Sequence, residues 1–101
     1  MKYELTPQHS RNKSYYGKAV VEEKDGIKAL TSYSTLVCYI DNNGLHRLWH
    51  GYSATTQKHI HDFALQNNLK GCGKADWDKM PIESTPEGFT PCPSKYTVSL
   101  W

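Results

Sequence analysis

Gly51-Tyr52-Ser53-Ala54-Thr55-Thr56-Gln57-Lys58-His59-Ile60-His61-Asp62-Phe63 is the stretch of this chain that decides its fold. A run of strand-forming residues ends at Gly51, and the hydroxyl of Ser53 can accept a hydrogen bond from a free amide of a first helical turn. The spacing predicts a helix over 54–67. Its buried stripe, at spacings of three and four, consists of Thr56, Ile60, Phe63, Ala64 and Asn67. The side predicted to face water carries Gln57, Lys58, His61, Asp62 and Gln66.

Four strands are predicted before this helix. Residues 16–23 alternate weakly, and Asp25-Gly26 predicts a hairpin that returns over 27–32, with Tyr33-Ser34 as a bulge or a continuation. Residues 35–40 are rich in β-branched, aromatic and aliphatic side chains. The turn at 41–44 contains an Asn-Gly pair and leads into 45–50. In that last strand Leu45, Arg47 and Trp49 share one face, and His46, Leu48 and His50 share the other.

The two ends of the chain carry weaker patterns. Residues 1–14 are polar and predict a loosely tied, flexible arm. Gly71 follows the end of the main helix, residues 74–80 predict a short second helix stopped by Pro81, and 85–93 reads as a loop with three prolines. We therefore predict an α+β domain over 15–81 and a C-terminal extension over 82–101. The sheet is antiparallel with four strands, or five if 96–101 adds to an edge, and the main helix packs on one face.

The composition of the chain limits the possible functions. The chain has 101 residues and a formal net charge of +2, which by itself does not indicate a polyanionic partner. Its three cysteines, Cys38, Cys72 and Cys92, are an odd number and argue against a disulfide scaffold. The first residues contain no apolar segment typical of a secretory signal, and no run is long enough to span a membrane. We expect a reduced, soluble protein of the cytoplasm.

Part of the sequence resembles a family of small uncharacterised proteins from phages and mobile elements of Gram-positive and gut bacteria. The resemblance rests on residues 16–19, 30–37 and 49–56, followed by His59-Ile60 and Phe63, and it covers 15–81. No activity of that family can be transferred to this chain. The resemblance implies a small accessory protein that acts in a bacterial host cell and binds a host protein. Inhibitors of bacterial defence, including anti-CRISPR proteins, are a prominent class of such proteins.

Neither a metal site nor a catalytic site emerges clearly from the spacing. His59 and His61 are two apart on a helix and diverge, and His46 and His50 lie roughly 13 Å apart along a strand. A zinc site combining His59 with the cysteines would lack the paired spacing of structural sites. Ser53, Thr55 or Thr56 near His59 places a hydroxyl beside a base, but the sequence indicates no orienting acid or oxyanion hole. We expect no metal, no cofactor and no catalytic residue.

Two surfaces are candidates for binding a partner. The first is the edge formed by the last strand and the helix start, with Arg47, His50, Tyr52, Thr55, Lys58 and His59. It mixes residue types enriched at recognition sites, and the helix start would also attract anions. The second is a sheet face where Tyr39 and Trp49 accompany Arg47. These side chains would stack nucleobases or act as hot spots of a protein interface. Alternatively, the C-terminal segment with Trp77 and Trp101 covers them and forms a second small core.

The sequence thus predicts a non-enzymatic binding protein that inhibits a host protein, a CRISPR effector being one such target. The first alternative is a nucleic-acid-binding accessory protein. The second is a small hydrolase or a nucleotide-binding protein. The sequence does not identify the target or the oligomeric state.

Overall fold

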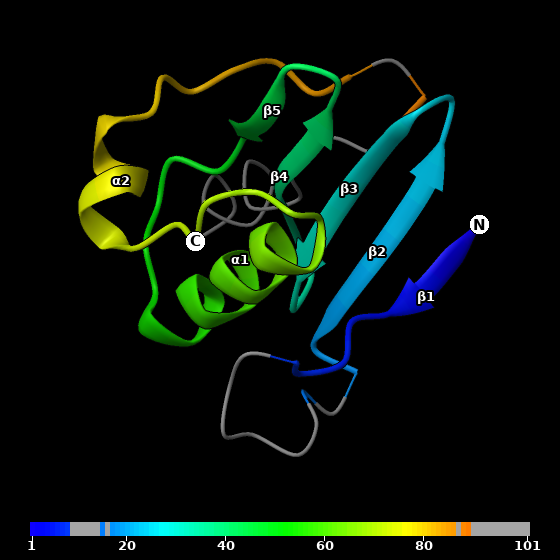
Figure 1. Cartoon of the computed structure of the whole chain (residues 1–101), viewed down its shortest axis with the longest axis horizontal. Coiled ribbons are helices and arrows are strands. Elements are labelled where there is room, and N and C mark those ends of the chain that lie inside the picture. Colours follow the sequence, from blue (N-terminus) through cyan, green and yellow to red (C-terminus); the bar gives the residue numbers. More distant parts are fainter. Residues whose placement is uncertain (9–14, 16, 87, 90–101) are drawn as a thin grey trace, which may run out of the picture.

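The computed structural model of the protein describes residues 1–8, 15, 17–86 and 88–89 (Figure 1). Five strands form one antiparallel sheet whose spatial order follows the sequence, and one main helix and a short helix complete an α+β fold. The elements are β1 (Lys2–Glu4), β2 (Ala19–Lys24), β3 (Ile27–Ser32), β4 (Thr35–Asp41), β5 (Gly44–Arg47), α1 (Ala54–Gln66) and α2 (Lys74–Lys79). The predicted fold class is confirmed.

Turn chemistry fixes the hairpins on either side of the central strands. Asp25 and Gly26 join β2 to β3 with φ values of 54° and 78°, which is the backbone that a two-residue hairpin loop of this sequence adopts. Asn42 and Asn43 join β4 to β5, and Gly44 follows them with a φ of 112°. Both turns lie where the sequence predicts them.

The turn between β3 and β4 was not predicted. Tyr33 and Ser34 form it, since Ser32 pairs directly with Thr35, so they are neither a bulge nor a continuation. Tyr33 has a φ of 59°, a region that a bulky L-residue seldom occupies. Its amide donates a hydrogen bond to the Lys18 carbonyl at 2.6 Å, which holds the strained turn against the start of β2.

A bulge in β4 shortens the last strand of the sheet. The register between β3 and β4 shifts after Leu30, and the amides of Leu48 and Trp49 both donate to the Val37 carbonyl, at 2.9 and 3.0 Å. The two residues that directly follow β5 thus share one acceptor, and the regular ladder stops at Arg47. The predicted strand over 45–50 is therefore too long.

The main core lies between the sheet and α1. Ser53 caps α1 as predicted, because its Oγ accepts a hydrogen bond from the Thr56 amide at 3.1 Å. Ile60 and Phe63 are fully buried. The buried members of this core are Leu5, Tyr15, Ala19, Val21, Leu30, Val37, Cys38, Ile40, Ile60, Phe63, Cys72 and Trp77. The core therefore draws on segments from Leu5 to Trp77, beyond the 15–69 region where most apolar residues lie.

The predicted water-facing side of α1 is only partly exposed. Lys58 and His61 are exposed, but Gln57 and Asp62 are buried. The Gln57 amide donates to the Cys72 carbonyl at 2.9 Å, and the Asp62 carboxylate accepts from the Tyr15 hydroxyl at 2.8 Å. Segments before and after the helix therefore wrap around it, and only a narrow strip of α1 reaches solvent.

Residues 2–4 belong to the sheet, so for the described residues 1–8 the prediction of a flexible arm over 1–14 is corrected. β1 pairs antiparallel with β2, and Leu5 is buried. The Gln8 amide donates to the Asp62 carboxylate at 3.0 Å. Residues 9–14 lie outside the described part of the chain. The fifth strand of the sheet is thus N-terminal.

A second, smaller cluster covers the sheet face opposite α1. Its buried members are Ala29, Leu36, Leu48 and Phe89, with Ile27 and Tyr39 packed against them. Ile82 forms a parallel bridge with Arg47, and the Glu83 amide donates to the Arg47 carbonyl at 2.8 Å. The start of the predicted extension therefore packs on the domain. The predicted strand over 96–101 lies outside the described residues.

Neither described helix combines the length and the apolarity needed to cross a bilayer.

Candidate functional site

Arg47 does not form the exposed contact that the sequence predicts. Its side chain is buried, and its guanidinium donates to three main-chain carbonyls: Nε to Trp49 at 2.8 Å, Nη1 to Trp77 at 2.7 Å and Nη2 to His50 at 2.8 Å. The guanidinium carbon also lies 4.7 Å from the centroid of the Trp77 ring. Arg47 therefore ties β5, the loop after it and the end of α2 together, and it is not a surface group.

His59 is buried as well, with 1% of its surface exposed. Its Nδ1 lies 2.9 Å from the Ser32 hydroxyl, which is itself 2.9 Å from the Thr56 hydroxyl. The Tyr15 ring lies 4.4 Å from the imidazole, centroid to centroid. Burial lowers the pKa of His59, although Asp62 acts in the opposite direction, so the imidazole is neutral near pH 7. This hydroxyl–imidazole group is closed to an approaching substrate in this conformation.

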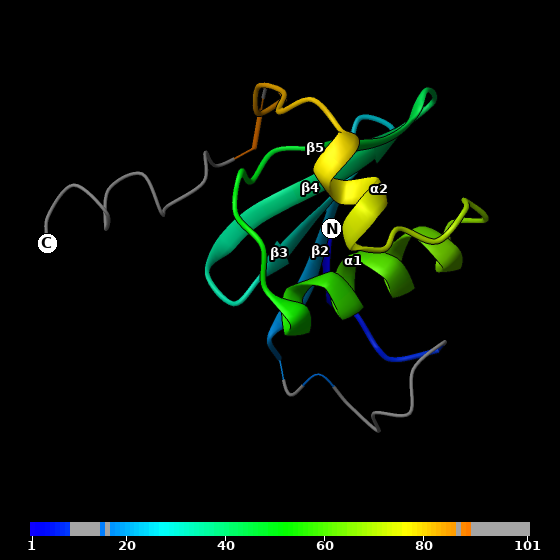
Figure 2. The same ribbon diagram turned by 90° about the vertical axis from the view of Figure 1, so that its left-hand side faces the viewer.

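The other predicted residues, His50, Tyr52, Thr55 and Lys58, are exposed. Tyr52 and Lys58 lie on an open groove with a volume of about 260 Å³. The groove runs between the start of α1 and the segment that leads into α2. Figure 2 shows α2 and the start of α1 on the side of the molecule that is turned toward the viewer. It is lined by Tyr52, Ala54, Gln57, Lys58, His61, Cys72 and Gly73. The structure thus brings part of the predicted surface together and adds residues from 72–73.

Two contacts hold the walls of the groove in place. The Trp77 indole donates to the Gly51 carbonyl at 2.9 Å, which fixes the loop before α1 against α2. Gly71 lies so close to the His61 imidazole that a Cβ on this glycine would sit 2.2 Å from its Cε1. Together with the Arg47 contacts, these interactions make the groove a preorganised surface.

The groove has one lysine, Lys58, and one prominent aromatic, Tyr52, among its lining residues. Tyr52 is 43% exposed, and the Lys74 ammonium lies 5.2 Å from the centroid of its ring. A hydrogen bond with Asp78 raises the pKa of Lys74, which stays charged. No acidic residue lines this groove. Gln57 and His61 were predicted to face water but not to form the site, and Cys72 and Lys74 were not predicted there because only the fold brings residues 71–74 back to the start of α1.

The alternative sheet-face site is divided between two faces. Arg47 pairs with Cys38 on the helix side, and Trp49 packs against the main core, whereas Tyr39 pairs with His46 on the opposite face. Trp77 also belongs to the helix side. Phe89 joins the cluster against which Tyr39 packs, whereas Trp77 contacts Arg47 on the helix side. The described residues therefore do not form the single second core predicted over Tyr39, Arg47 and Trp49. Trp101 is outside the described residues.

His46 links this opposite face to the segment after α2. Its Nε2 lies 2.8 Å from the Asp41 carboxylate and its Nδ1 lies 2.7 Å from the Glu83 carboxylate, and its ring stacks on Tyr39 at 4.6 Å. Donating to both carboxylates requires an imidazolium. Burial lowers the pKa of His46, but the bonds to Glu83 and Asp41 outweigh burial and raise it.

The two described cysteines are buried thiols. Burial raises the pKa of Cys38 well above its usual value, with a contribution from Cys72, and burial also raises the pKa of Cys72. Protonated buried thiols are poor nucleophiles and poor ligands. Within the described part of the chain, no three His, Cys, Asp or Glu side chains gather in a way that could hold a metal. Cys92 lies outside it.

Comparison with known proteins places the chain in a family but gives it no activity. Residues 3–79 match the model of a family of unknown function, DUF8033. No curated protein and no solved structure matches the chain. The matched span runs from within β1 to the end of α2 and includes both walls of the groove.

Proposed function

The chain belongs to the DUF8033 family, whose function is unknown, and we propose that it is a non-enzymatic protein that binds a protein partner through the groove between α1 and α2. The carrying observation is the exposed Tyr52 ring on a groove whose walls are held by the hydrogen bond from the buried Trp77 indole to the Gly51 carbonyl. Exposed tyrosines on rigid surfaces contribute strongly to protein interfaces, because they add contact area at little entropic cost.

The shape of the groove supports a macromolecular partner over a small ligand. Sites for small molecules are concave and usually enclose roughly 300–1,000 Å³. This groove is open and holds about 260 Å³, enough for one or two side chains of a partner. The buried hydroxyl–imidazole group of Ser32, Thr56 and His59 lies outside the groove lining. A side chain inserted beside Tyr52 is therefore the form of recognition that we propose.

The identity of the partner rests on the sequence resemblance alone. The resemblance to phage and mobile-element proteins supports a protein of the bacterial host as the partner, and a defence factor such as a CRISPR effector is the class of target that we propose. The protein would then act in the cytoplasm of that cell. Inhibition would follow if the groove covers a surface that the effector needs.

Nucleic acid is the second candidate, since the exposed groups around the groove are basic and aromatic. Lys58 and His61 line the groove together with Tyr52, and the Lys74 ammonium, which is paired with Asp78, lies near the Tyr52 ring. A lysine beside an exposed aromatic also suits a phosphate backbone and a stacked base. The two candidates differ in their dependence on salt. For nucleic acid, a plot of log affinity against log salt concentration steepens by roughly one unit of slope for each phosphate contact. The affinity for a protein partner held by aromatic burial depends less on salt.

A matched pair of surface variants tests the proposal. Tyr33 is also an exposed tyrosine, and the Lys18 ammonium lies 5.9 Å from its ring, yet it sits on the β3–β4 turn outside the groove. In pull-downs from nuclease-treated host lysate, Tyr52→Asn and Lys58→Glu should lose the partner, and Tyr33→Asn and Lys18→Glu should retain it. Asparagine suits the positive φ of Tyr33. Equal retention by all four variants would move the binding surface elsewhere.

A further inference from the structure

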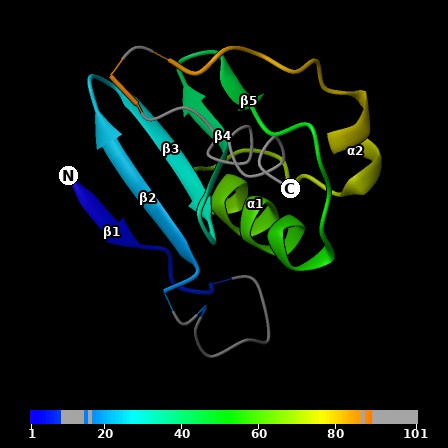
Figure 3. The same cartoon turned by 180° about the vertical axis from the view of Figure 1, so that it is seen from behind.

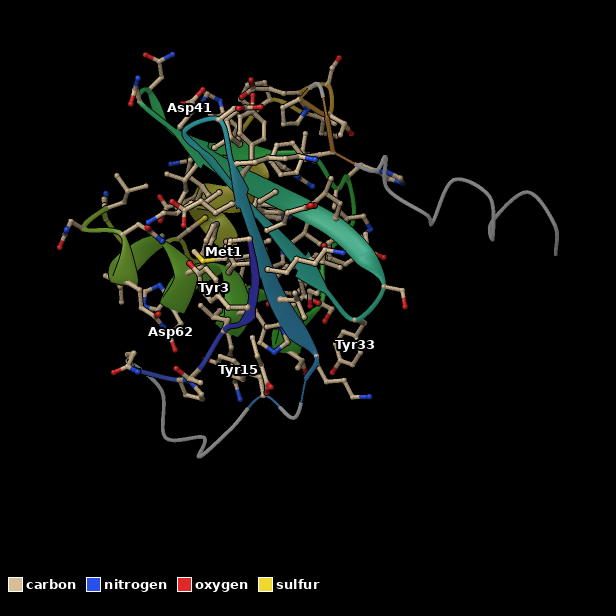
Figure 4. All side chains as sticks on the ribbon, turned by 90° about the vertical axis from the view of Figure 1, so that its right-hand side faces the viewer. Met1, Tyr3, Tyr15, Tyr33, Asp41 and Asp62 are labelled. Atoms are coloured by element: carbon tan, nitrogen blue, oxygen red, sulfur yellow. The ribbon has the colours of Figure 1, made fainter. Side chains whose placement is uncertain are left out.

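β1 is an edge strand whose outer side has no strand partner among the described residues. The sheet order begins with β1, and its only strand neighbour is β2. Lys2, Tyr3 and Glu4 are all exposed. At the opposite edge, β5 differs, because Ile82 forms a parallel bridge with Arg47. Figure 4 views the molecule from the β1 side and shows Met1 and Tyr3 at this edge.

The hydrogen bonds to β2 determine which groups of β1 point outward. The Leu5 amide donates to the Ala19 carbonyl at 2.8 Å, and the Glu23 amide donates to the Met1 carbonyl at 2.7 Å. Backbone groups of an extended strand alternate between its two edges. Residues 1, 3 and 5 therefore face β2, and the amides and carbonyls of Lys2 and Glu4 face away from the sheet.

The order of charges on this edge is complementary to itself. When two copies of β1 pair antiparallel about a two-fold axis at Tyr3, Lys2 of each copy lies opposite Glu4 of the other. The outward amides and carbonyls of Lys2 and Glu4 then form four backbone hydrogen bonds. Tyr3 lies opposite its counterpart as a non-hydrogen-bonded pair, the arrangement in which side chains approach most closely. We propose that β1 is the interface of a symmetric homodimer with one continuous sheet.

Neighbouring registers are unfavourable. The pairing of two β1 strands can shift only by two residues. A shift of one would place backbone groups that point out of one strand opposite backbone groups that point back toward β2 in the other. A shift of two places Lys2 opposite Lys2 or Glu4 opposite Glu4, and like charges directly opposite each other destabilise a strand pair. Only the register centred on Tyr3 aligns opposite charges at both positions, so the sequence Lys2-Tyr3-Glu4 specifies it.

The proposed dimer is closed and leaves the groove accessible. A two-fold pairing uses the free edge of each copy, and the other edge is occupied by the Ile82 segment, so no chain of further copies follows. β1 and α2 lie on opposite sides of the molecule (Figures 1 and 3). The interface is short, and we expect a weak dimer that forms with rising concentration. It does not depend on the function proposed for the groove.

Charge reversal tests this register directly. In analytical ultracentrifugation of the full chain over a concentration series, Lys2→Glu and Glu4→Lys should each weaken the dimer by roughly tenfold or more, because each sets two like-charged pairs in the interface. Mixing the two single variants should restore association, since each then meets its complement. The double variant Lys2→Glu/Glu4→Lys should associate with itself like the parent.

A backbone variant gives an independent test. Proline at position 2 removes an amide that faces away from β2, so Lys2→Pro should abolish the dimer and leave the fold intact. Glu4 also accepts a hydrogen bond from the Gly17 amide at 2.8 Å, so circular dichroism must show that Glu4→Lys is folded. The proposal is overturned if the parent stays monomeric to about millimolar concentration, where even weak association of this strength is populated. It is equally overturned if Lys2→Pro dimerises like the parent, or if the mixed variants fail to associate.

Discussion

Replacing Arg47 tests whether this buried side chain stabilises the fold by linking β5, the loop after it and α2. Arg47→Met removes the guanidinium and keeps a side chain that can pack beside Trp77. Three hydrogen bonds to the carbonyls of Trp49, His50 and Trp77 are lost; the bond to Trp77 is buried and the other two are partly buried. The arrangement joins β5, the groove loop and α2, so its loss should affect the whole fold.

The magnitude follows from the number of bonds and the burial. A hydrogen bond from a charged donor contributes about 1.5–3 kcal/mol, but relief from burying the guanidinium offsets part of the sum. We expect Arg47→Met to lower the free energy of unfolding by about 3–5 kcal/mol. For a domain of this size that lowers Tm by roughly 12 °C or more. Arg47→Glu should be at least as damaging, because it buries an unpaired charge.

Chemical denaturation followed by circular dichroism measures the effect, with Lys58→Met as the control. Lys58 is exposed, so its replacement should change stability by less than about 0.5 kcal/mol. A loss below about 1 kcal/mol for Arg47→Met would refute the reasoning. It would mean that water or other groups satisfy the three carbonyls, and Arg47 would again be available as a functional residue.

Three further predictions concern other parts of the fold. Phe63→Ala should cost about 3–5 kcal/mol in denaturant melts because Phe63 is fully buried; a loss below about 1 kcal/mol would contradict the core assignment. Ser53→Ala should cost about 1 kcal/mol and leave partner binding unchanged; loss of binding at unchanged stability would make the hydroxyl functional. His46→Gln should destabilise the protein more at pH 6 than at pH 9. The raised pKa of His46 means that its contribution is complete below the unfolded value of about 6.5 and is lost as pH rises through the folded value. Equal effects at both pH values would mean that His46 is neutral in the fold.

The hairpins and α1 were predictable because their signals are local. Asp25-Gly26 determines the turn before β3, and the bounds Ile27–Ser32 agree with the predicted 27–32. Ser53 determines the start of α1 through its own hydroxyl. β1 was not predicted because a segment of three residues, Lys2–Glu4, is too short to show a periodic pattern. It becomes a strand only by pairing with β2. The turn at Tyr33 escaped because tyrosine does not signal a positive φ.

The candidate site was only partly predictable because its burial is a tertiary property. Alternation correctly placed Leu45 and Arg47 on one face of β5, but it could not show that this face is the one covered by Trp77 from α2. His59 follows a polar helix start and looks exposed in sequence, yet Ser32 and Tyr15 enclose it.

Site-specific photo-crosslinking tests the central claim that the groove is the binding surface. A benzophenone side chain would replace Tyr52 in one protein and Tyr33 in another, and both would be irradiated in nuclease-treated host lysate. We predict that position 52 alone forms an adduct with one protein, and that excess unlabelled parent removes this adduct while excess Tyr52→Asn does not. An identical adduct from position 33, or competition by Tyr52→Asn equal to that of the parent, would contradict the account.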